Sequence, residues 1–224
     1  MLPGKEVYMK KGAIFDMDGL LFDTQRYFDQ SWPQVAAEMG YECPDEFMKE
    51  LAGSSGRQMR MSIEKYFPGV DYVKFLDRGH ELVQEKTDRE LPVKPGAEEL
   101  VKYFFENGVK IAVASGNRRE VVESNLRKAG LMKYVDAVIC GAEVSNAKPD
   151  PEIFVTAAKM LGLKSEECYV FEDSLNGVHA GGASGSTTIM VPDLREPDEK
   201  CKETAAGIYQ TLTEAMEDIR DGKI

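Results

Sequence analysis

The chain has 224 residues, of which 42% are hydrophobic and 30% are charged, and its formal charge is −11. This composition is typical of a globular protein with one large domain, or with one domain and a smaller insertion. The acidic balance argues against a nucleic-acid partner, because phosphate backbones are met by clustered Lys and Arg. A small phosphorylated ligand is still compatible, since a local basic site can lie within an acidic surface.

The cysteines and the N-terminal residues favour a cytoplasmic protein without a membrane partner. Cys43, Cys140, Cys168 and Cys201 show no CxxC spacing, which argues against a disulfide framework or a zinc site and favours reduced thiols. Residues 1–12 contain no apolar stretch of about seven residues and no cleavage pattern, so we expect no signal peptide. No apolar run approaches the ~20 residues that a membrane helix requires.

The first predicted strand, Ala13–Phe15, runs directly into the segment DMDGLLFDT. Asp16 and Asp18 lie on the same side of an extended strand end, because side chains alternate along a strand. Two carboxylates this close repel each other unless a cation compensates them. A calcium loop also begins with spaced aspartates, but Gly19 and the apolar residues after it do not fit the calcium-loop spacing.

Residues 25–90 predict a helical insertion. They contain amphipathic segments and no convincing strand, and the segments that predict helices are SWPQVAAEMG, EFMKELAG, RQMRMSIEKYF and YVKFLDRGHELVQEK. The stretch ELPVKPGAEEL that follows contains two prolines and a glycine, which suit a hinge or a linker. We therefore predict an α/β core that is interrupted after its first strand by an all-helical insertion.

Four further strands and four helices are predicted after the insertion. The strands are Val109–Ala114, Ala137–Cys140, Tyr169–Phe171 and Thr187–Val191. Short apolar runs that alternate with helix-period segments predict parallel strands joined by crossover helices. One helix opens at a capping box formed by Asn117 and Glu120, and a second opens at the cap residue Asp150. A third helix runs from about Ser174 to Ala183, and the fourth covers residues 212–219.

Polar residues follow three of these strands, at the point where each strand ends. They are Asp16 and Asp18, then Ser115, Gly116 and Asn117, and finally Glu172 and Asp173. The carboxyl ends of parallel strands meet at one edge of the sheet, and that edge binds ligands. Converging carboxylates favour a hard dication, and Mg²⁺ fits best with carboxylates, substrate phosphate and water.

A phosphate ligand also fits the remaining polar residues at this edge. Lys148 follows the third strand and could supply the positive charge that lets a phosphoryl group approach an aspartate. Gly116 and Asn117 lie where backbone N–H groups and a helix N-terminus can bind anionic oxygens. Asp16 is then a candidate nucleophile that forms an aspartyl-phosphate. Asp18 can protonate the leaving oxygen and later take a proton from the attacking water.

The motifs DMDGLLFDT, VASGN, AKPDPEIF and FEDSLNGV occur in this order along the chain. They resemble the four motifs of the haloacid dehalogenase-like (HAD) superfamily, in the branch of β-phosphoglucomutase-like phosphatases and mutases. The resemblance implies a Rossmann-like core at residues 1–24 and 93–224. It also implies a helical cap at residues 25–92 that opens and closes over the substrate.

The resemblance assigns a role to each motif residue by its position. Asp16 would be the nucleophile and a metal ligand, and Asp18 would be the general acid/base and bind the metal through its backbone carbonyl. The other implied roles are phosphoryl contacts from Ser115 and Lys148, Mg²⁺ ligation by Asp173 with Glu172, and a cap hinge at Thr24.

A substrate contact from the cap is expected at Arg57, in LAGSSGRQM. The family often presents a basic residue from this part of the cap, and Arg26, Arg60 and Lys86 are the alternatives. His80 and His179 adjoin no motif, and we interpret the two histidines as solvated or core residues.

Three functions stay open on the sequence alone. The first is a Mg²⁺-dependent phosphatase for a small phosphate monoester, with sugar phosphates ahead of nucleotide monophosphates as substrates; the others are a phosphoglucomutase and a binding protein with a decayed site. The β-phosphoglucomutases have a histidine a few residues after the Asp-Thr of the first motif, and Phe28 occupies that position here, which favours a hydrolase. Every ionisable residue of the motifs is present, which argues against decay. Nothing demands more than a monomer.

Overall fold

The computed structural model describes residues 9–51 and 56–224, and at residues 56 and 57 it describes the backbone only, without the side chain of Arg57. Residues 1–8, part of the segment in which we expect no signal peptide, and the cap residues 52–55 lie outside this description.

A six-stranded parallel sheet forms the core, in the order β3-β2-β1-β4-β5-β6. The strands are β1 (Gly12–Phe15), β2 (Lys110–Ser115), β3 (Ala137–Cys140), β4 (Cys168–Glu172), β5 (Thr187–Met190) and β6 (Gly207–Ile208). The predicted α/β class is confirmed, and each predicted strand agrees with the observed one to within a single residue at its ends. Strand β6 was not predicted, because two residues are too short to give a period.

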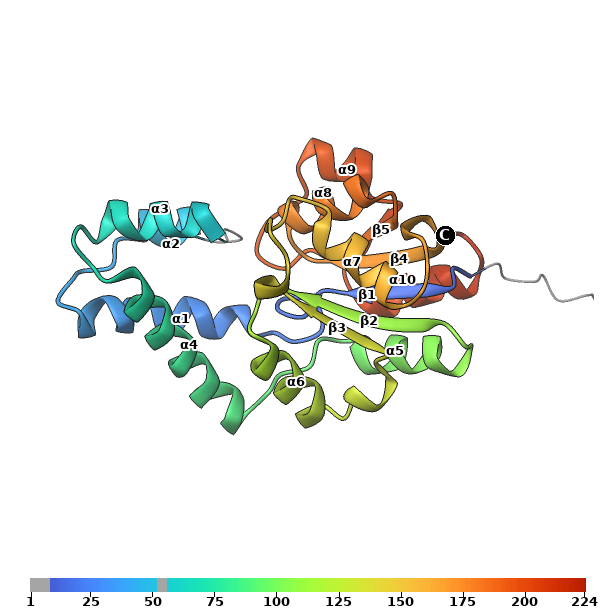
Figure 1. Cartoon of the computed structure of the whole chain (residues 1–224), viewed down its shortest axis with the longest axis horizontal. Helices are drawn as coiled ribbons and strands as arrows, with labels where there is room; N and C mark the ends of the chain where they lie inside the picture. The colour runs from blue at the N-terminus through green and yellow to red at the C-terminus, as the bar shows by residue number, and fades with distance from the viewer. Residues whose placement is uncertain (1–8, 52–55) are drawn as a thin grey trace, which may run out of the picture.

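Helices cover both faces of this sheet (Figure 1). One face carries α5 (Ala97–Glu106), α6 (Arg119–Lys128) and α10 (Leu212–Arg220), and the other carries α7 (Glu152–Met160) and α8 (Leu175–Ser184), with α9 (Glu199–Thr204) against α8. Successive strand residues point to opposite faces, so Phe15 packs with α5 and Ile14 with α7. Both faces are buried, which explains why the strands read as continuous apolar runs.

The chain changes direction across the sheet at β1. Strand β1 pairs with β2 on one side and with β4 on the other, both in parallel. The crevice between the carboxyl ends of β1 and β4 is therefore a topological switch point, where open α/β sheets bind their ligands. Asp16 follows β1 and Asp173 follows β4, so the predicted acidic residues flank this crevice.

Four helices that follow β1 form a separate helical lobe. They are α1 (Gln25–Glu38), α2 (Asp45–Leu51), α3 (Gly56–Tyr66) and α4 (Tyr72–Arg89), and they pack around an apolar core that includes Trp32, Phe47 and Phe75. The lobe lies beside the carboxyl ends of the strands (Figure 1). The inserted all-helical cap is thus confirmed as part of the fold. None of the described helices combines the length and the apolar composition needed to cross a membrane.

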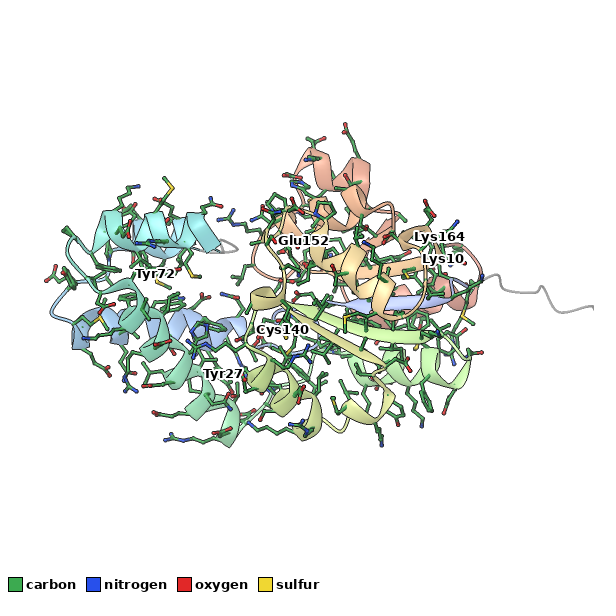
Figure 2. All side chains as sticks on the ribbon, in the orientation of Figure 1. Lys10, Tyr27, Tyr72, Cys140, Glu152 and Lys164 are labelled. Atoms are coloured by element: carbon green, nitrogen blue, oxygen red, sulfur yellow. The ribbon has the colours of Figure 1, made fainter. Side chains whose placement is uncertain are left out.

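Figure 2 shows the relation of the lobe to the core through two labelled side chains. Cys140, the last residue of β3, lies at the edge of the core that faces the lobe, and Tyr72 lies on the lobe itself. The carboxyl ends of the strands therefore point towards the lobe.

The two chain segments that connect core and lobe pair with each other. The N–H of Asp23 donates to the Pro92 carbonyl at 2.9 Å, and the N–H of Lys94 donates to the Leu21 carbonyl at 2.9 Å. The linker predicted from its prolines is therefore one half of a two-stranded junction. The domain boundaries at residues 24 and 93 and the hinge motion between the domains stay predictions.

Candidate active site

A buried ion-pair cluster lies at the carboxyl ends of β1 and β4. Lys148, from the loop between β3 and α7, donates through Nζ to Asp16 Oδ1 at 2.5 Å and to Glu172 Oε1 at 2.6 Å. The side chains of Lys148, Asp16 and Glu172 are 13%, 10% and 1% exposed. Burying these charges is costly unless they are paired and hydrogen-bonded, and the cluster meets that condition.

The cluster holds more negative than positive charge. Burial raises the pKa of Asp16 to about 7, against the attraction of Lys148. Burial alone would lower the pKa of Lys148, but the charges of Asp16 and Glu172 hold it above its usual value. The pKa of Asp173 is raised well above its usual value by burial, and further by Glu172 and Asp16. A bound dication would offset this excess.

The carboxylate of Glu172 is fully engaged by protein donors. Its Oε1 accepts from Lys148, and its Oε2 accepts from the N–H of Asp173 at 3.0 Å, the N–H of Ser174 at 3.1 Å and Ser174 Oγ at 3.0 Å. These contacts do not support the predicted role of Glu172 as a metal ligand. They instead make it the residue that orients Lys148 towards Asp16.

Gly177, in the first turn of α8, makes room for Glu172. A Cβ atom at this position would lie 1.8 Å from Cδ of Glu172, so we expect Gly177→Ala to displace that carboxylate and release Lys148. Overpacking of this kind costs about 1–3 kcal/mol of folding free energy, and activity per folded molecule falls because Lys148 is no longer oriented. Urea unfolding and phosphate-release assays measure the two effects.

Gly182→Ala is the matched control for this substitution. It lies in the same helix and would also make a close contact, 2.1 Å from Cγ2 of Thr204, but that contact faces α9. We expect lower stability with unchanged activity per folded molecule. Equal loss of activity in both variants would contradict the role assigned to Glu172.

The side chain of Asp18 is held by three polar donors. Thr24 Oγ1 donates to its Oδ1 at 2.6 Å, and Ser115 Oγ and Asn117 Nδ2 lie 3.4 and 3.3 Å from its Oδ2. Burial raises the pKa of Asp18. A carboxyl group that keeps its proton to higher pH is suited to proton transfer near neutral pH.

The residues predicted to bind phosphate after β2 lie beside Asp18. Ser115 and Asn117 contact its carboxylate, and Gly116 is exposed between them. The capping box predicted to open a helix at Asn117 is wrong, because α6 begins at Arg119, after an N-cap at Arg118 without a side-chain hydrogen bond. Asn117 instead directs its amide to Asp18. Phosphate binding by these three residues stays a prediction.

A cavity of about 580 Å³ joins this cluster to the helical lobe. Its wall on the core side includes Asp16, Asp18, Ser115, Gly116, Asn117, Lys148 and Asp173, and its wall on the lobe side includes Phe28, Trp32, Tyr72, Leu76 and His80. The structure therefore brings residues from all four predicted motifs to one cavity. The side chain of Arg57 lies outside the described residues, so its substrate contact stays a prediction.

His80 is a cavity residue that the sequence pattern did not single out. Its ring meets Phe28 edge-on at 5.7 Å between centroids, and its Nδ1 lies 2.7 Å from the Leu76 carbonyl. A carbonyl only accepts, so the proton lies on Nδ1 and Nε2 carries a lone pair that can accept a hydrogen bond. Burial lowers the pKa of His80. No local signal marks it, because no motif lies near it in the chain.

A parallel α/β core with a helical lobe over an acidic, lysine-containing cavity defines an enzyme of the capped α/β type. Comparison with known proteins identifies the family. The profile of the haloacid dehalogenase-like hydrolases matches residues 13–191, and the chain belongs to this family. The predicted enzyme class, a HAD-type phosphoric monoester hydrolase, is confirmed by this match and by relatives that are named as phosphatases.

Two curated relatives match most of the chain. The chain is 32% identical over 195 residues, 84% of either protein, to a "Probable pseudouridine-5'-phosphatase" of Drosophila melanogaster. It is 30% identical over 176 residues to a "Phosphorylated carbohydrates phosphatase" of Thermotoga maritima, which is 78% of this chain and 82% of the relative.

Solved structures support the fold. CbbY from Rhodobacter sphaeroides in complex with phosphate matches with a TM-score of 0.81 at 22% identity, covering 92% of this chain and 96% of that one. A β-phosphoglucomutase from Clostridium difficile matches with a TM-score of 0.80 at 22% identity, covering 96% and 97%. At this identity the likeness supports the architecture of core and cap.

Proposed function

We propose that this protein is a Mg²⁺-dependent phosphatase that hydrolyses a small phosphate monoester, of the sugar phosphate class, through an aspartyl-phosphate on Asp16. The observation that carries the proposal is the ion pair of Lys148 with Asp16 and Glu172 at the switch point of the sheet. It places a cation where phosphoryl oxygens need one, next to a carboxylate that can attack phosphorus. The names of the two curated relatives support a phosphate monoester as the substrate.

The residues at the cluster fit Mg²⁺. The carboxylates of Asp16 and Asp173 and the backbone carbonyl of Asp18 would hold the ion, because Mg²⁺ binds oxygen ligands and takes few carboxylates alongside substrate phosphate and water. The raised pKa values of Asp16 and Asp173 support this fit, since burial and the neighbouring carboxylates disfavour their ionised forms in the absence of a cation. When bound, Mg²⁺ would neutralise the phosphoryl oxygens and keep Asp16 ionised.

The protein residues then divide the reaction into two steps. Asp16 attacks phosphorus and forms an acyl phosphate as the ester oxygen leaves, and Asp18 gives that oxygen its proton. In the second step Asp18 takes a proton from water, which attacks phosphorus, releases inorganic phosphate and restores the Asp16 carboxylate. Lys148 compensates the charge on the phosphoryl oxygens in both steps, and Glu172 holds it in place.

A phosphosugar mutase is the second candidate, and His80 favours it. Phe28 occupies the position at which β-phosphoglucomutases have a histidine, but His80 lies directly against Phe28 in the same cavity. An imidazole is therefore available near the place where the mutase histidine would orient a sugar. Such a residue would restrain hydrolysis of the phosphoenzyme and favour transfer back to the substrate.

One assay separates the two functions. Phosphate release is measured over a panel of phosphate monoesters, with Mg²⁺ and with chelator. The panel includes β-glucose 1-phosphate with a trace of glucose 1,6-bisphosphate, for which glucose 6-phosphate is also assayed. Stoichiometric, metal-dependent phosphate release supports the phosphatase, and glucose 6-phosphate with little free phosphate would establish the mutase. Activity that survives chelator would contradict the Mg²⁺ requirement.

The Mg²⁺ affinity is expected to fall as the pH is lowered. The pKa of Asp16 is raised to about 7 in the metal-free protein, and the metal binds the ionised carboxylate, so protons compete with Mg²⁺ below that pH. We expect the dissociation constant to rise at least about tenfold for each pH unit well below 7, because Asp173, whose pKa is also raised, must lose its proton as well. Calorimetric Mg²⁺ titrations at several pH values check this, and a constant affinity would contradict it.

A further inference from the structure

Asp193, a short distance after β5, carries a buried carboxylate oxygen that has no hydrogen-bond partner among the described residues. Its side chain is 12% exposed, and its Oδ1 accepts from Lys94 Nζ at 2.7 Å. Its Oδ2 is buried and accepts no hydrogen bond from any residue that the structure describes. A buried polar atom in this state is costly, so a native protein usually satisfies it with a water, an ion or a ligand.

The position of Gly19 locates this oxygen beside the proposed metal ligands. A Cβ atom on Gly19 would lie 2.4 Å from Asp173 Oδ2 and 3.2 Å from Asp193 Oδ2. Two carboxylate oxygens therefore approach the same small volume over the turn of the first motif. Gly19 has a φ of +86° and no side chain, which lets both carboxylates approach this turn closely.

The charges around Asp193 indicate which kind of group its Oδ2 can contact. Lys94 pairs with the far oxygen, Oδ1. On the near side Asp193 faces Asp173, so the two negatively charged groups approach the same turn. An ionised carboxylate has no proton to donate, so it can only accept hydrogen bonds. A hydrogen-bond donor with positive charge behind it, such as a water polarised by a dication, therefore satisfies both requirements.

We propose that Asp193 accepts, through Oδ2, a hydrogen bond from a water in the hydration shell of Mg²⁺ held by Asp16 and Asp173. This inference rests on the proposed Mg²⁺ site. Mg²⁺ gives up its water reluctantly and keeps several water ligands in proteins. Partners of this kind orient the inner ligands, and their loss usually lowers metal affinity by about 10–100-fold.

Lys94 connects this arrangement to the junction between core and lobe. Its ammonium group pairs with Asp193, and its backbone N–H donates to the Leu21 carbonyl in the other connecting segment. The ion pair is largely buried, with Lys94 20% exposed. One side chain of the linker is thus fixed by the same carboxylate that faces the metal position.

Two substitutions break the same ion pair and test the proposal through Mg²⁺ binding to the full-length protein without substrate. Asp193→Asn removes the acceptor charge, and we expect its Mg²⁺ dissociation constant to rise about 10–100-fold. Lys94→Met leaves the Asp193 carboxylate and removes its competing cation, so we expect an unchanged or lower dissociation constant. Calorimetry and the Mg²⁺-induced shift in unfolding temperature measure the affinity, and circular dichroism verifies folding. Asp193→Ser replaces the Asn variant if that variant does not fold.

The outcomes separate this inference from the proposed function. A higher dissociation constant in Asp193→Asn, together with an unchanged or lower one in Lys94→Met, supports the hydration-shell contact. Wild-type affinity in Asp193→Asn, or equal weakening in both variants, would overturn the inference and leave Asp193 as a structural ion-pair partner. A wild-type protein that binds no Mg²⁺ would overturn the metal site itself, and the inference with it.

Discussion

Asp16→Asn is expected to abolish turnover while leaving the fold intact. The amide neither attacks phosphorus nor binds Mg²⁺ as a carboxylate does, so both the nucleophile and a metal ligand are lost. Phosphate release with the best substrate of the panel measures the loss, which we expect to reach the detection limit. An Asn variant with a near-native rate would remove Asp16 as the nucleophile.

The unfolding temperature of the Asp16→Asn variant gives a second measurement, which is independent of turnover. Burial raises the pKa of Asp16 to about 7, so ionisation disfavours the folded state and the metal-free protein loses stability from this group as the pH rises from about 4 to 7. Asparagine does not ionise. In chelator at about pH 8 the variant should therefore unfold at no lower temperature than the wild type. Asp221→Asn, on the exposed C-terminal segment, is the control and should change neither property.

Asp18→Asn is expected to slow the reaction of esters with poor leaving groups much more than the reaction of esters with good ones. A good leaving group departs without a proton, so 4-nitrophenyl phosphate should still phosphorylate Asp16 slowly. Alkoxide leaving groups need the proton, and their rates should fall on the order of 10²–10⁴-fold. Rapid-quench measurements of the first turnover with both kinds of ester report this ratio.

Thr24→Val is the matched control for the Asp18 variant. It removes the hydroxyl that donates to Asp18 Oδ1 but keeps the carboxyl group, so we expect a smaller loss and a weaker dependence on the leaving group. Equal losses for both leaving groups in Asp18→Asn would argue against proton transfer by Asp18.

The fold, and the convergence of the site residues at the carboxyl ends of the strands, could be predicted from the sequence for a simple reason. Buried parallel strands read as short apolar runs, and their carboxyl ends meet at one edge, so the residues that follow each run must converge. Asp16, Ser115, Lys148 and Asp173 all line one cavity in the structure, as this reasoning requires. Ordered motifs along the chain made the family recognisable as well.

The rest depends on packing that has no local signature. The contacts of Glu172 with Lys148 and with the start of α8 arise only when that helix docks on the strand end, with Gly177 at the contact. His80 reaches the cavity from α4, and Asp193 approaches the turn at Gly19 from the segment after β5, and neither segment carries a motif. Spacing along the chain cannot indicate such contacts, because they join segments that are distant in sequence.

The most direct test of the proposed chemistry is to identify the phosphorylated residue. Wild-type protein and Asp18→Asn are mixed with Mg²⁺ and 4-nitrophenyl phosphate, quenched in acid and treated with borohydride, which reduces an acyl phosphate to the alcohol and so converts a phosphorylated aspartate to homoserine. Peptide mass spectrometry then locates the change. We predict homoserine at position 16 in the Asp18→Asn protein, and in chelator none. Homoserine at another position, or an unmodified Asp16 during a measured burst of 4-nitrophenol, would contradict Asp16 as the nucleophile.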